Sequence, residues 1–446
     1  MLLPDAFWES LREALVSVRK EETILARFSA ALDEESPACV RLNPWKKAHL
    51  PILEGATQVP WSEEGWRLLK RPVYTLHPLF HAGAYYVQDA SSMFVGAVLR
   101  RVLQLPAIQK TAVERPLRVL DLCAAPGGKT TDAAASLRQA FGDGFELLAN
   151  EYNARRFAIL KDNVEVWGDP QVTVCNTQAA RLGQMTGCYD IIIVDAPCSG
   201  EGMFRKEPQA VEQWSPKKVE ECAALQRSIL DDIAPALAPG GYLIYSTCTY
   251  NTKENEGSVN HLLESGSFEA IDLKTLMSQE ASAAETAGET LLWSSLNAAP
   301  ADADAPAHAV RLLPGLVHGE GQFCALVQKV RNGRMGRERL VALPSVKAEA
   351  PAASPECPTS YALDRSRWPN IGVDKQTALN FLHGDSLVLP DAPKGLLLLT
   401  DRRRSLRKRG QNGGRFPAGI CRRRQRRTFR QEKQKTGGRQ KNARST

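Results

Sequence analysis

The sequence of 446 residues predicts an α/β fold, a doubly wound parallel sheet with helices on both faces. Two observations predict it. Short apolar segments alternate with amphipathic, helix-like segments between residues 117 and 246, which is the pattern of repeated strand–helix units. The apolar segments are also nearly continuous in Val, Ile and Leu, as is typical of strands buried on both faces. The sheet is therefore expected to be covered by helices on both sides.

The segment 117–131 is the expected centre of this sheet. It begins as an apolar strand over 117–122, passes through a turn of small residues and continues as an alanine-rich helix from near Thr130. A strand, a glycine turn and a helix N-terminus together form a cradle for a ligand. Gly127 and Gly128 have no Cβ, so backbone amides at this turn can approach a bound molecule closely.

Two ligand-binding motifs are absent from this turn, and their absence limits the kind of ligand that it can bind. The Walker phosphate loop requires a glycine at the position of Cys123, and the dinucleotide pattern G-x-G-x-x-G is absent. An acidic strand end, Asp121, followed by a turn of small residues favours a nucleoside that carries an amino-acid tail. S-adenosylmethionine is such a molecule.

Further strands and helices follow the central strand. Helices are expected at 155–167 and 219–237, and strands at 145–149, 172–174, 189–195 and 240–246. Two more strands are expected to end the sheet as an antiparallel hairpin, at 310–313 and 322–327. Two segments are interpreted as irregular: a proline-containing loop at 104–116 before the central strand, and an Ala-, Glu- and Asp-rich surface insertion at 279–307.

Smaller units flank this central domain. The predicted boundaries are 1–84 for a small α+β domain, 85–331 for the central domain, 332–360 for a Pro/Ala linker, 361–400 for the start of a third module and 401–446 for a basic, disordered tail. Basic and aromatic residues of the first unit are candidates for RNA contact, with a packed accessory domain as the equal alternative: Arg41, Trp45, Lys46, Lys47, Trp61 and Trp66.

The composition is that of a soluble globular protein. Hydrophobic residues make up 43% and charged residues 24% of the chain, and no apolar run is long enough to span a bilayer. The ten cysteines contain no C-x-x-C pair, which argues against a zinc ribbon or a disulfide framework. We therefore expect a monomer in a reducing cytoplasm, with no metal and no membrane contact. The net charge of +7 permits nucleic-acid binding, although much of the excess lies in the tail.

Polar residues follow four of the predicted strands. They are Asp121, Glu151, Asp195 and Cys248. Ligands of doubly wound sheets bind beyond the carboxyl ends of the strands, so these side chains are expected to line one site. An acid after the second strand commonly receives the hydroxyls of a ribose, and we assign that role to Glu151.

Two cysteines and an acid suggest the chemistry of this site. Carbon 5 of cytosine is a poor nucleophile, but a thiolate that adds to carbon 6 turns it into an enamine carbon that can attack a methyl donor. An acid at the N3 edge favours the addition, and a second group must help to remove the carbon-5 proton and expel the thiol. Asp195 suits the N3 edge, and either Cys198 or Cys248 can in principle attack carbon 6. The Asn/Asp-Pro-Pro-aromatic sequence of many amine methyltransferases is absent, because Cys198 occupies the second proline position.

Four sequence motifs agree with this chemistry. They are Tyr85-Tyr-Val-Gln-Asp-Ala-Ser-Ser, Asp121-Leu-Cys-Ala-Ala-Pro-Gly-Gly-Lys-Thr, Asp195-Ala-Pro-Cys-Ser-Gly-Glu-Gly-Met-Phe-Arg-Lys and Ser246-Thr-Cys-Thr. In this order they resemble the Sun (Fmu-type) family of RNA cytosine-5 methyltransferases, over roughly residues 1–330. The resemblance implies a Rossmann-like class I S-adenosylmethionine-dependent methyltransferase fold, an N-terminal RNA-binding domain and a C-terminal PUA-like module. It also implies an RNA substrate, and the members that this chain most resembles modify 16S ribosomal RNA or its small-subunit precursor.

The resemblance also implies roles for individual residues. Cys248 is the implied nucleophile, and Cys198 is the implied helper of product release. The implied contacts to S-adenosylmethionine come from Cys123, Ala124, Ala125, Pro126, Gly127, Gly128, Lys129, Glu151, Arg156 and Asp195.

Two departures from the family pattern stand out. Relatives often place Asp, sometimes Thr, after the third strand to meet the adenine, and the corresponding residue here is Thr177. Past residue 400 an arginine-rich run replaces the apolar strands expected of a PUA-like module, either as a genuine basic tail that holds phosphates or as the result of a reading-frame error. Two alternatives remain open at this point: the same chemistry on transfer RNA, and a non-catalytic RNA-binding factor in ribosome assembly.

Overall fold

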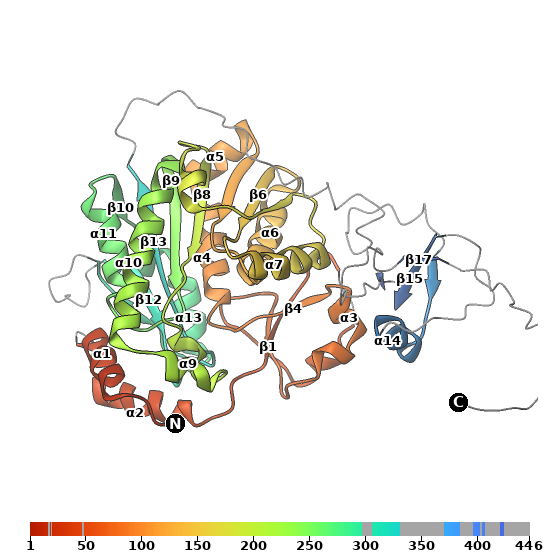
Figure 1. The fold of residues 1–446 in the computed structure, drawn as a ribbon, viewed down its shortest axis with the longest axis horizontal. Coiled ribbons are helices and arrows are strands. Elements are labelled where there is room, and N and C mark those ends of the chain that lie inside the picture. The colour runs from red at the N-terminus through yellow and green to blue at the C-terminus, as the bar shows by residue number, and fades with distance from the viewer. Residues whose placement is uncertain are drawn as a thin grey trace, which may run out of the picture.

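The computed structural model contains a nine-stranded sheet and a smaller, four-stranded sheet that packs beside it (Figure 1). It describes residues 1–296 except 17, 19, 47 and 48, residues 306–330 and 370–383, and the strands at 396–401, 404–405 and 420–422. The predicted linker, 332–360, and most of the predicted tail lie outside the described residues.

The large sheet has the doubly wound order that the sequence predicts, with an antiparallel extension. Its strands run in the order β11-β12-β13-β9-β8-β5-β6-β7, and β10 also pairs with β13. The parallel strands are β5 (Leu117–Asp121), β6 (Phe145–Asn150), β7 (Val172–Cys175), β8 (Tyr189–Asp195) and β9 (Leu237–Thr247). The antiparallel strands are β10 (Phe268–Ala270), β11 (Leu292–Ser294), β12 (Ala309–Leu312) and β13 (Gln322–Lys329).

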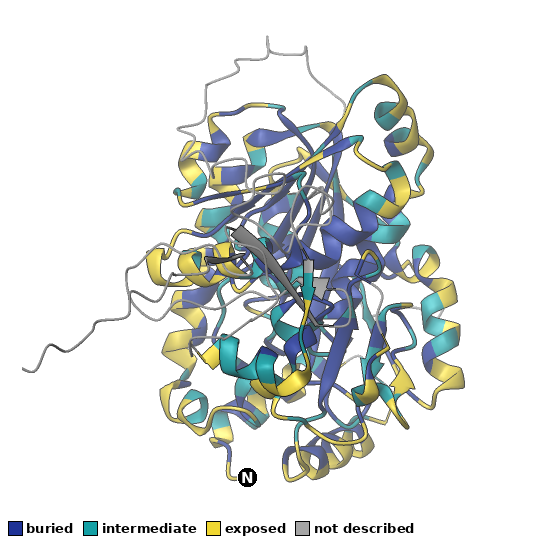
Figure 2. Cartoon of the chain, turned by 90° about the vertical axis from the view of Figure 1, so that its right-hand side faces the viewer, coloured by how far each residue is buried: buried dark blue, intermediate teal, exposed yellow. Residues whose placement is uncertain are grey.

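Helices cover both faces of the large sheet. Alternate residues of each strand point to opposite faces, so Ile191 and Ile192 of β8 belong to two separate apolar cores. The first core includes α4 (Met93–Leu103), α5 (Pro106–Glu114), α6 (Gly128–Phe141), α7 (Ala154–Trp167), α12 (Leu273–Leu276) and α13 (Ser278–Thr286). The second includes α8 (Ala179–Gly183), α10 (Pro216–Ile233) and α11 (Glu256–Glu264). Figure 2 shows the strands as a buried layer between more exposed helices.

The N-terminal part contributes two helices and the small sheet. Helices α1 (Asp5–Leu15) and α2 (Glu21–Leu32) share an apolar cluster with Phe204, Trp214 and Tyr250 of the large domain. The small sheet has the order β2-β3-β1-β4. Its elements and the short helices around it are β1 (Cys39–Leu42), η1 (Pro51–Leu53), β2 (Thr57–Gln58), β3 (Gly65–Arg67), η2 (Tyr74–Leu76), α3 (Pro78–His81) and β4 (Tyr85–Val87). The predicted boundary after residue 84 cuts ahead of β4, whereas β4 pairs with β1 inside the small sheet.

Several basic and aromatic residues proposed for RNA contact are instead buried structural residues. Arg41 and Lys46 are only 1% and 2% exposed, and Trp61 is 3% exposed against Phe94. The Lys46 ammonium donates to the carbonyls of Ala82 and Val166, 3.2 and 2.7 Å away. For Arg41, Lys46 and Trp61 the packed alternative is therefore correct, because their polar groups are used up by the domain junction.

Two segments that were interpreted as irregular contain regular elements among their described residues. The predicted loop at 104–116 holds helix α5, which begins at Pro106, because proline is well suited to a first helical position. The predicted surface insertion at 279–307 holds α13 and the edge strand β11, and Leu291 and Leu292 are buried. The acidic composition concealed the few apolar residues that join the core.

Five elements described beyond residue 369 form a small sheet and a helix. They are β14 (Asn370–Gly372), α14 (Lys375–His383), β15 (Leu396–Asp401), β16 (Arg404–Ser405) and β17 (Ile420–Arg422). Strand β15 pairs with each of the other three strands. The PUA-like assignment of this region stays a prediction.

Candidate functional site

The predicted site residues meet at the carboxyl edge of the parallel strands. Two adjoining cavities, of about 400 and 260 Å³, lie there and share Cys123 in their walls. The first cavity follows β6 and β7, and the second lies beyond β8 and β9. The structure therefore brings together the four strand ends that the sequence singled out.

The small-residue loop at 123–129 separates the two cavities and is held from both sides. Gly127 has a φ of +110°, a conformation that side chains rarely adopt, and its N–H donates to Ala124 O at 2.8 Å. From α7, the Arg156 guanidinium donates to Ala125 O at 2.6 Å. From the small sheet, the Tyr86 hydroxyl donates to Pro126 O at 3.1 Å. The Ala125–Pro126 peptide is cis.

Arg41 supports the helix that follows this loop. Its guanidinium donates to Gly128 O at 3.2 Å and to the Thr131 hydroxyl at 2.6 Å, and it lies 3.7 Å from an Asp132 carboxylate oxygen. All of these groups belong to the first turns of α6. The small sheet thus fixes the helix whose N-terminus forms the cradle.

Asp121 lies fully buried beneath the loop. One carboxylate oxygen accepts the Thr130 hydroxyl at 2.6 Å, and no described residue donates to the other. Burial raises the pKa of Asp121 to about 7. The central strand therefore ends in a buried acid whose charge is poorly compensated.

The first cavity combines one acid with apolar walls. Glu151 is 5% exposed, and its Oε1 accepts the Asn153 N–H at 2.8 Å. Its Oε2 lies 3.5 Å from the Arg156 guanidinium and accepts no hydrogen bond from a described residue. Leu122, Pro197 and Ile229 line the same cavity. A buried acceptor beside apolar walls fits a ribose with its base.

Thr177 also lines this first cavity, at the end of β7. Its backbone N–H donates to the Asn150 side-chain oxygen at 3.0 Å. That bond fixes the backbone of the turn and leaves the role of the hydroxyl toward an adenine a prediction.

The second cavity contains an ion pair beside the cysteines. The Lys129 ammonium lies 2.7 Å from Asp195 Oδ2 and donates to the Ser92 hydroxyl at 3.0 Å. Asp195 Oδ1 accepts from the Ser246 hydroxyl at 2.8 Å and from the Gln322 amide at 3.2 Å. Burial opposes protonation of Lys129, but the charge and hydrogen bond of Asp195 outweigh it and raise the pKa of Lys129. Asp195 is therefore held in one orientation by three donors.

Cys248 lines the second cavity, and Cys198 lies beside it. Their sulfur atoms are 3.3 Å apart, within hydrogen-bond distance for sulfur. The hydrogen bond with Cys248, followed by burial, raises the pKa of Cys198 well above its ordinary value. Either thiol can be the donor in this hydrogen bond.

Sequence reasoning missed several residues around the cysteines. Glu201, Asn251 and Glu254 are almost fully buried and bond the two cysteine loops to each other, and Gln322 reaches Asp195 from β13. Glu201 stood inside a quoted motif, so its place near Cys198 was visible. Its burial was not, because an acid in a loop normally faces solvent.

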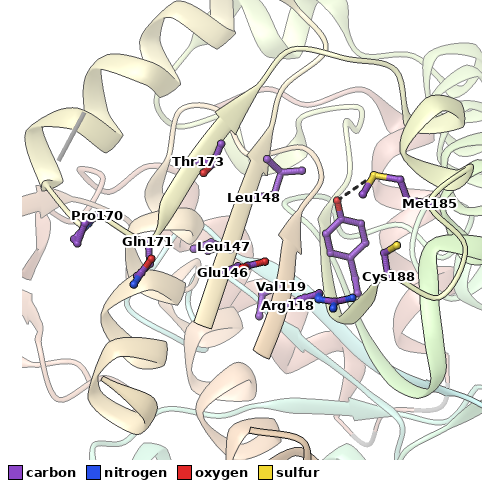
Figure 3. A pocket seen from close by; sticks show the side chains of 11 residues that line it. Arg118, Val119, Glu146, Leu147, Leu148, Pro170, Gln171, Thr173, Met185 and Cys188 are labelled. Atoms are coloured by element: carbon purple, nitrogen blue, oxygen red, sulfur yellow. Dashed lines mark hydrogen bonds between the residues drawn. The ribbon is translucent and has the colours of Figure 1, made fainter. Parts of the chain in front are cut away.

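Another cavity, of about 560 Å³, lies at the opposite edge of the sheet (Figure 3). Arg118, Glu146 and Tyr189 line it, and each stands at or near the start of its strand. The Tyr189 hydroxyl contacts the Met185 sulfur there, 3.7 Å away. This cavity is far from the strand ends that carry the acids and cysteines, so we place no chemistry in it.

Two kinds of feature are absent from the described residues. Among them, no group of three or more His, Cys, Asp and Glu side chains is placed to hold a metal ion. None of the described helices has the length and apolar character needed to cross a membrane.

Two family models match the chain. One, described as 16S rRNA methyltransferase RsmB/F, matches residues 110–328. The other, described as the N-terminal domain of 16S rRNA methyltransferase RsmF, matches residues 3–90. Together they span the large domain, the small sheet and both N-terminal helices.

Curated relatives agree with these matches. The chain is 36% identical over 274 residues to ribosomal RNA small subunit methyltransferase F of Escherichia coli O17:K52:H18, covering 58% of this chain and 53% of the relative. It is 37% identical over 274 residues, with the same coverage, to the protein of that name from Cronobacter sakazakii. The chain thus spans about half the length of the curated relatives it matches.

Solved structures share the fold. A methyltransferase homologue from Pyrococcus horikoshii is 25% identical, with a TM-score of 0.52, over 72% of this chain and 99% of that one. NSun6 from the same organism, solved with SFG, is 18% identical, with a TM-score of 0.53, over 73% and 98%. The likeness to NSun6 supports the Rossmann-like methyltransferase fold alone.

Proposed function

Because the chain belongs to the RsmB/F family of 16S rRNA methyltransferases, we propose that it transfers a methyl group from S-adenosylmethionine to carbon 5 of a cytosine in 16S rRNA. The observation that carries the proposal is the pair of sulfur atoms 3.3 Å apart, beside the Lys129–Asp195 ion pair. Carbon-5 methylation requires one thiol to attack carbon 6 and a second group to assist release. Amine methylation requires neither cysteine.

The first cavity and the loop at 123–129 are the proposed binding place of S-adenosylmethionine. The Oε2 of Glu151, which accepts no hydrogen bond from a described residue, would accept the ribose hydroxyls, and the apolar walls would hold the adenine beside Thr177. Amides of the loop would face the amino-acid tail, and Arg156 would keep the loop in place through Ala125. The bound molecule supplies the electrophilic methyl group. The shared wall at Cys123 would bring that group next to the second cavity.

The second cavity is the proposed place of the cytosine. Asp195, held by Lys129, Ser246 and Gln322, would meet the N3 edge and favour addition at carbon 6. Cys248 would be the nucleophile, as the family resemblance implies, because the raised pKa of Cys198 keeps that residue a thiol. Cys198 would then assist release of Cys248 after methylation. The new carbon–sulfur bond forms from Cys248 to carbon 6 and breaks again when the carbon-5 proton leaves.

The partner is proposed to be 16S rRNA or a small-subunit precursor in the cytoplasm, with the protein acting as a monomer. The names of the relatives support that substrate. Trp45, which is 43% exposed at the edge of the small domain, is a remaining candidate for RNA contact there. The region beyond residue 369 would add a PUA-like contact to RNA.

A methyl-transfer assay tests the proposal. The full chain is incubated with methyl-labelled S-adenosylmethionine and either unmodified 16S rRNA, assembled small subunits or transfer RNA, and the digested nucleosides are separated. We expect label in 5-methylcytidine from 16S rRNA or the small subunit. Label in 5-methylcytidine from transfer RNA alone would change the substrate, and label in another nucleoside would overturn the chemistry.

A further inference from the structure

Two buried carboxylates cross between the loops that carry the cysteines. Glu201 follows Cys198, yet its Oε2 accepts the backbone N–H of Tyr250, 2.5 Å away on the loop of Cys248. Glu254 follows Cys248, yet its Oε2 accepts the backbone N–H of Ser199, 2.9 Å away on the loop of Cys198. Each acid thus accepts a hydrogen bond from the backbone of the opposite cysteine loop.

One amide joins the two acids. The Asn251 side-chain nitrogen donates to Glu201 Oε1 and to Glu254 Oε1, both 2.8 Å away. Helix α10 holds Glu254 from outside, because the Gln226 amide donates to its Oε2 at 2.8 Å. The Trp214 indole does the same for Glu201 at 3.0 Å. Glu201 and Glu254 are 1% and 0% exposed.

The loops also touch directly. The Gly202 N–H donates to Cys248 O at 2.8 Å. A Cβ at Gly202 would come within 2.6 Å of that oxygen, so the contact depends on glycine. Two charged acceptors and one close backbone contact therefore set the distance between the loops.

We propose that Glu201 and Glu254 are positioning residues that fix the distance and orientation of the Cys198 and Cys248 thiols. The proposal rests on the proposed function, and it assigns to these acids the geometry that the two-cysteine mechanism needs. Neither acid is among the residues that line the two cavities. They act through the backbone of Ser199 and Tyr250, one and two residues from the cysteines.

The charge state of Glu254 supports this role. Burial raises the pKa of Glu254, and the neighbouring Glu201 charge adds to the rise, although hydrogen bonds from Ser199 and Asn251 oppose it. Backbone N–H groups need an acceptor, which a glutamate always offers. A glutamine at either position would turn one acceptor into a donor and leave a buried N–H facing another.

The test compares Glu201→Gln and Glu254→Gln with the wild-type chain in two assays. In the first, methyl transfer to the RNA accepted by the wild-type chain should show kcat lowered by about 10- to 100-fold, as for a misplaced reacting group. The KM for RNA and the Kd for S-adenosylmethionine should change by no more than about twofold, because binding groups are untouched. Glu289→Gln is the matched control. Glu289 is likewise buried, with 2% of its surface exposed, but its ion-pair partner is Arg67 of the small sheet.

The second assay needs no catalysis. Phenylarsine oxide binds two neighbouring thiols with loss of water, and intact-mass measurement reports its capture. The wild-type chain and Glu289→Gln should capture it, Cys198→Ser should not, and both proposed positioning variants should capture it much more slowly. Fast capture in a folded Glu201→Gln and a folded Glu254→Gln would overturn the proposal, even if kcat falls.

The two assays separate this proposal from the proposed function. Slow capture in both variants, with no methylation by the wild-type chain, would uphold the positioning role and reject the reaction. Should either variant fail to fold, Asn251→Ser keeps both acids and removes the shared amide. Its capture should also be slowed, and capture at the wild-type rate would contradict the proposal.

Discussion

The Lys129 ammonium forms an ion pair with Asp195, 2.7 Å away, in the wall of the second cavity. The lysine comes from the first turn of α6, and the acid ends β8. Burial alone would lower the pKa of Lys129, and Asp195 reverses the direction. The pair thus links the loop of one cavity to the chemistry of the other.

The first prediction concerns this pair. In Asp195→Asn the carboxylate charge is gone and burial remains, so the pKa of Lys129 should fall from its raised value. Competitive acetylation across a pH series, read by mass spectrometry, follows the lysine directly. Lys161, which is half-exposed on α7, serves as the internal control. An unchanged pKa of Lys129 in this variant would mean that the Asp195 carboxylate does not stabilise the charged form of the lysine.

The second prediction concerns Glu151. Glu151→Ala removes the buried acceptor of the first cavity. The affinity for S-adenosylmethionine should fall by about 10- to 100-fold, the effect of losing a charge-assisted hydrogen bond. Calorimetric titration measures it. Glu165→Ala is a control. Glu165 lies on α7, the helix that follows Glu151, and pairs with Lys161 away from the cavity. An unchanged dissociation constant for Glu151→Ala would remove this residue from the site.

The third prediction divides the work of the cysteines. Cys248→Ala should form no covalent adduct and no product. Cys198→Ala should still attack and methylate but fail to release, so a protein–RNA species should accumulate. Denaturing electrophoresis after incubation with RNA and S-adenosylmethionine reads both outcomes.

The opposite pattern would reverse this assignment. A stable adduct in Cys248→Ala, with none in Cys198→Ala, would make Cys198 the nucleophile. Methylation retained in both variants without any adduct would reject the covalent mechanism.

The fourth prediction concerns stability and pH. Burial raises the pKa of Asp121 from 3.8 to about 7, so the folded protein holds this proton to higher pH than the unfolded chain does. Folding stability from this group is therefore lost as pH rises from about 4 to about 7, and the full cost is present above that. Asp121→Asn cannot ionise, so it should unfold at a higher temperature than wild type at pH 8, with the difference shrinking toward pH 4. An equal shift at both pH values would show that Asp121 does not titrate in this range.

The fifth prediction concerns the domain junction. Arg41→Leu removes the guanidinium that bonds the buried Gln88, the Gly128 carbonyl and the Thr131 hydroxyl, while Asp132 keeps its ion pair with Arg100. Removing one partner of a buried charged network costs about 3–5 kcal/mol, and denaturant unfolding should show a loss of that size. Arg155→Leu on the exposed start of α7 is the control and should change little. A loss below about 1 kcal/mol in Arg41→Leu would show that the junction does not depend on this contact.

The positions of the parallel strands were predictable because periodicity and apolar runs report burial directly. β8 begins and ends where the sequence predicts, since Asp190 and Asp195 bracket four apolar residues, 191–194, in one run. The antiparallel hairpin of β12 and β13 also matches the prediction, because both strands are apolar. Helix α5 was not predicted because two prolines indicated a loop, whereas Pro106 is the first residue of the helix.

The position of the candidate site in the fold could be predicted from the sequence, whereas the residues that support it could not. Asp195, Cys198 and Cys248 were found because their chemistry is unusual at strand ends. Glu201 and Glu254 escaped, since nothing in a single sequence separates a buried acid in a loop from a solvated one. Arg41 was misassigned to RNA for the same reason, because only the packed structure shows which cations the protein itself neutralises.

The contact between Gln322 and Asp195 has a consequence for a chain that is still being made. Asp195 and both cysteines leave the ribosome well before β13, which supplies Gln322 and covers the free edge of β9. Until then β9 presents unpaired backbone groups to other chains. A nascent protein therefore carries both thiols and an open strand edge together until the moment when residues 322–329 pair with β9. A chaperone acting before that moment would protect the chemistry and the fold at once.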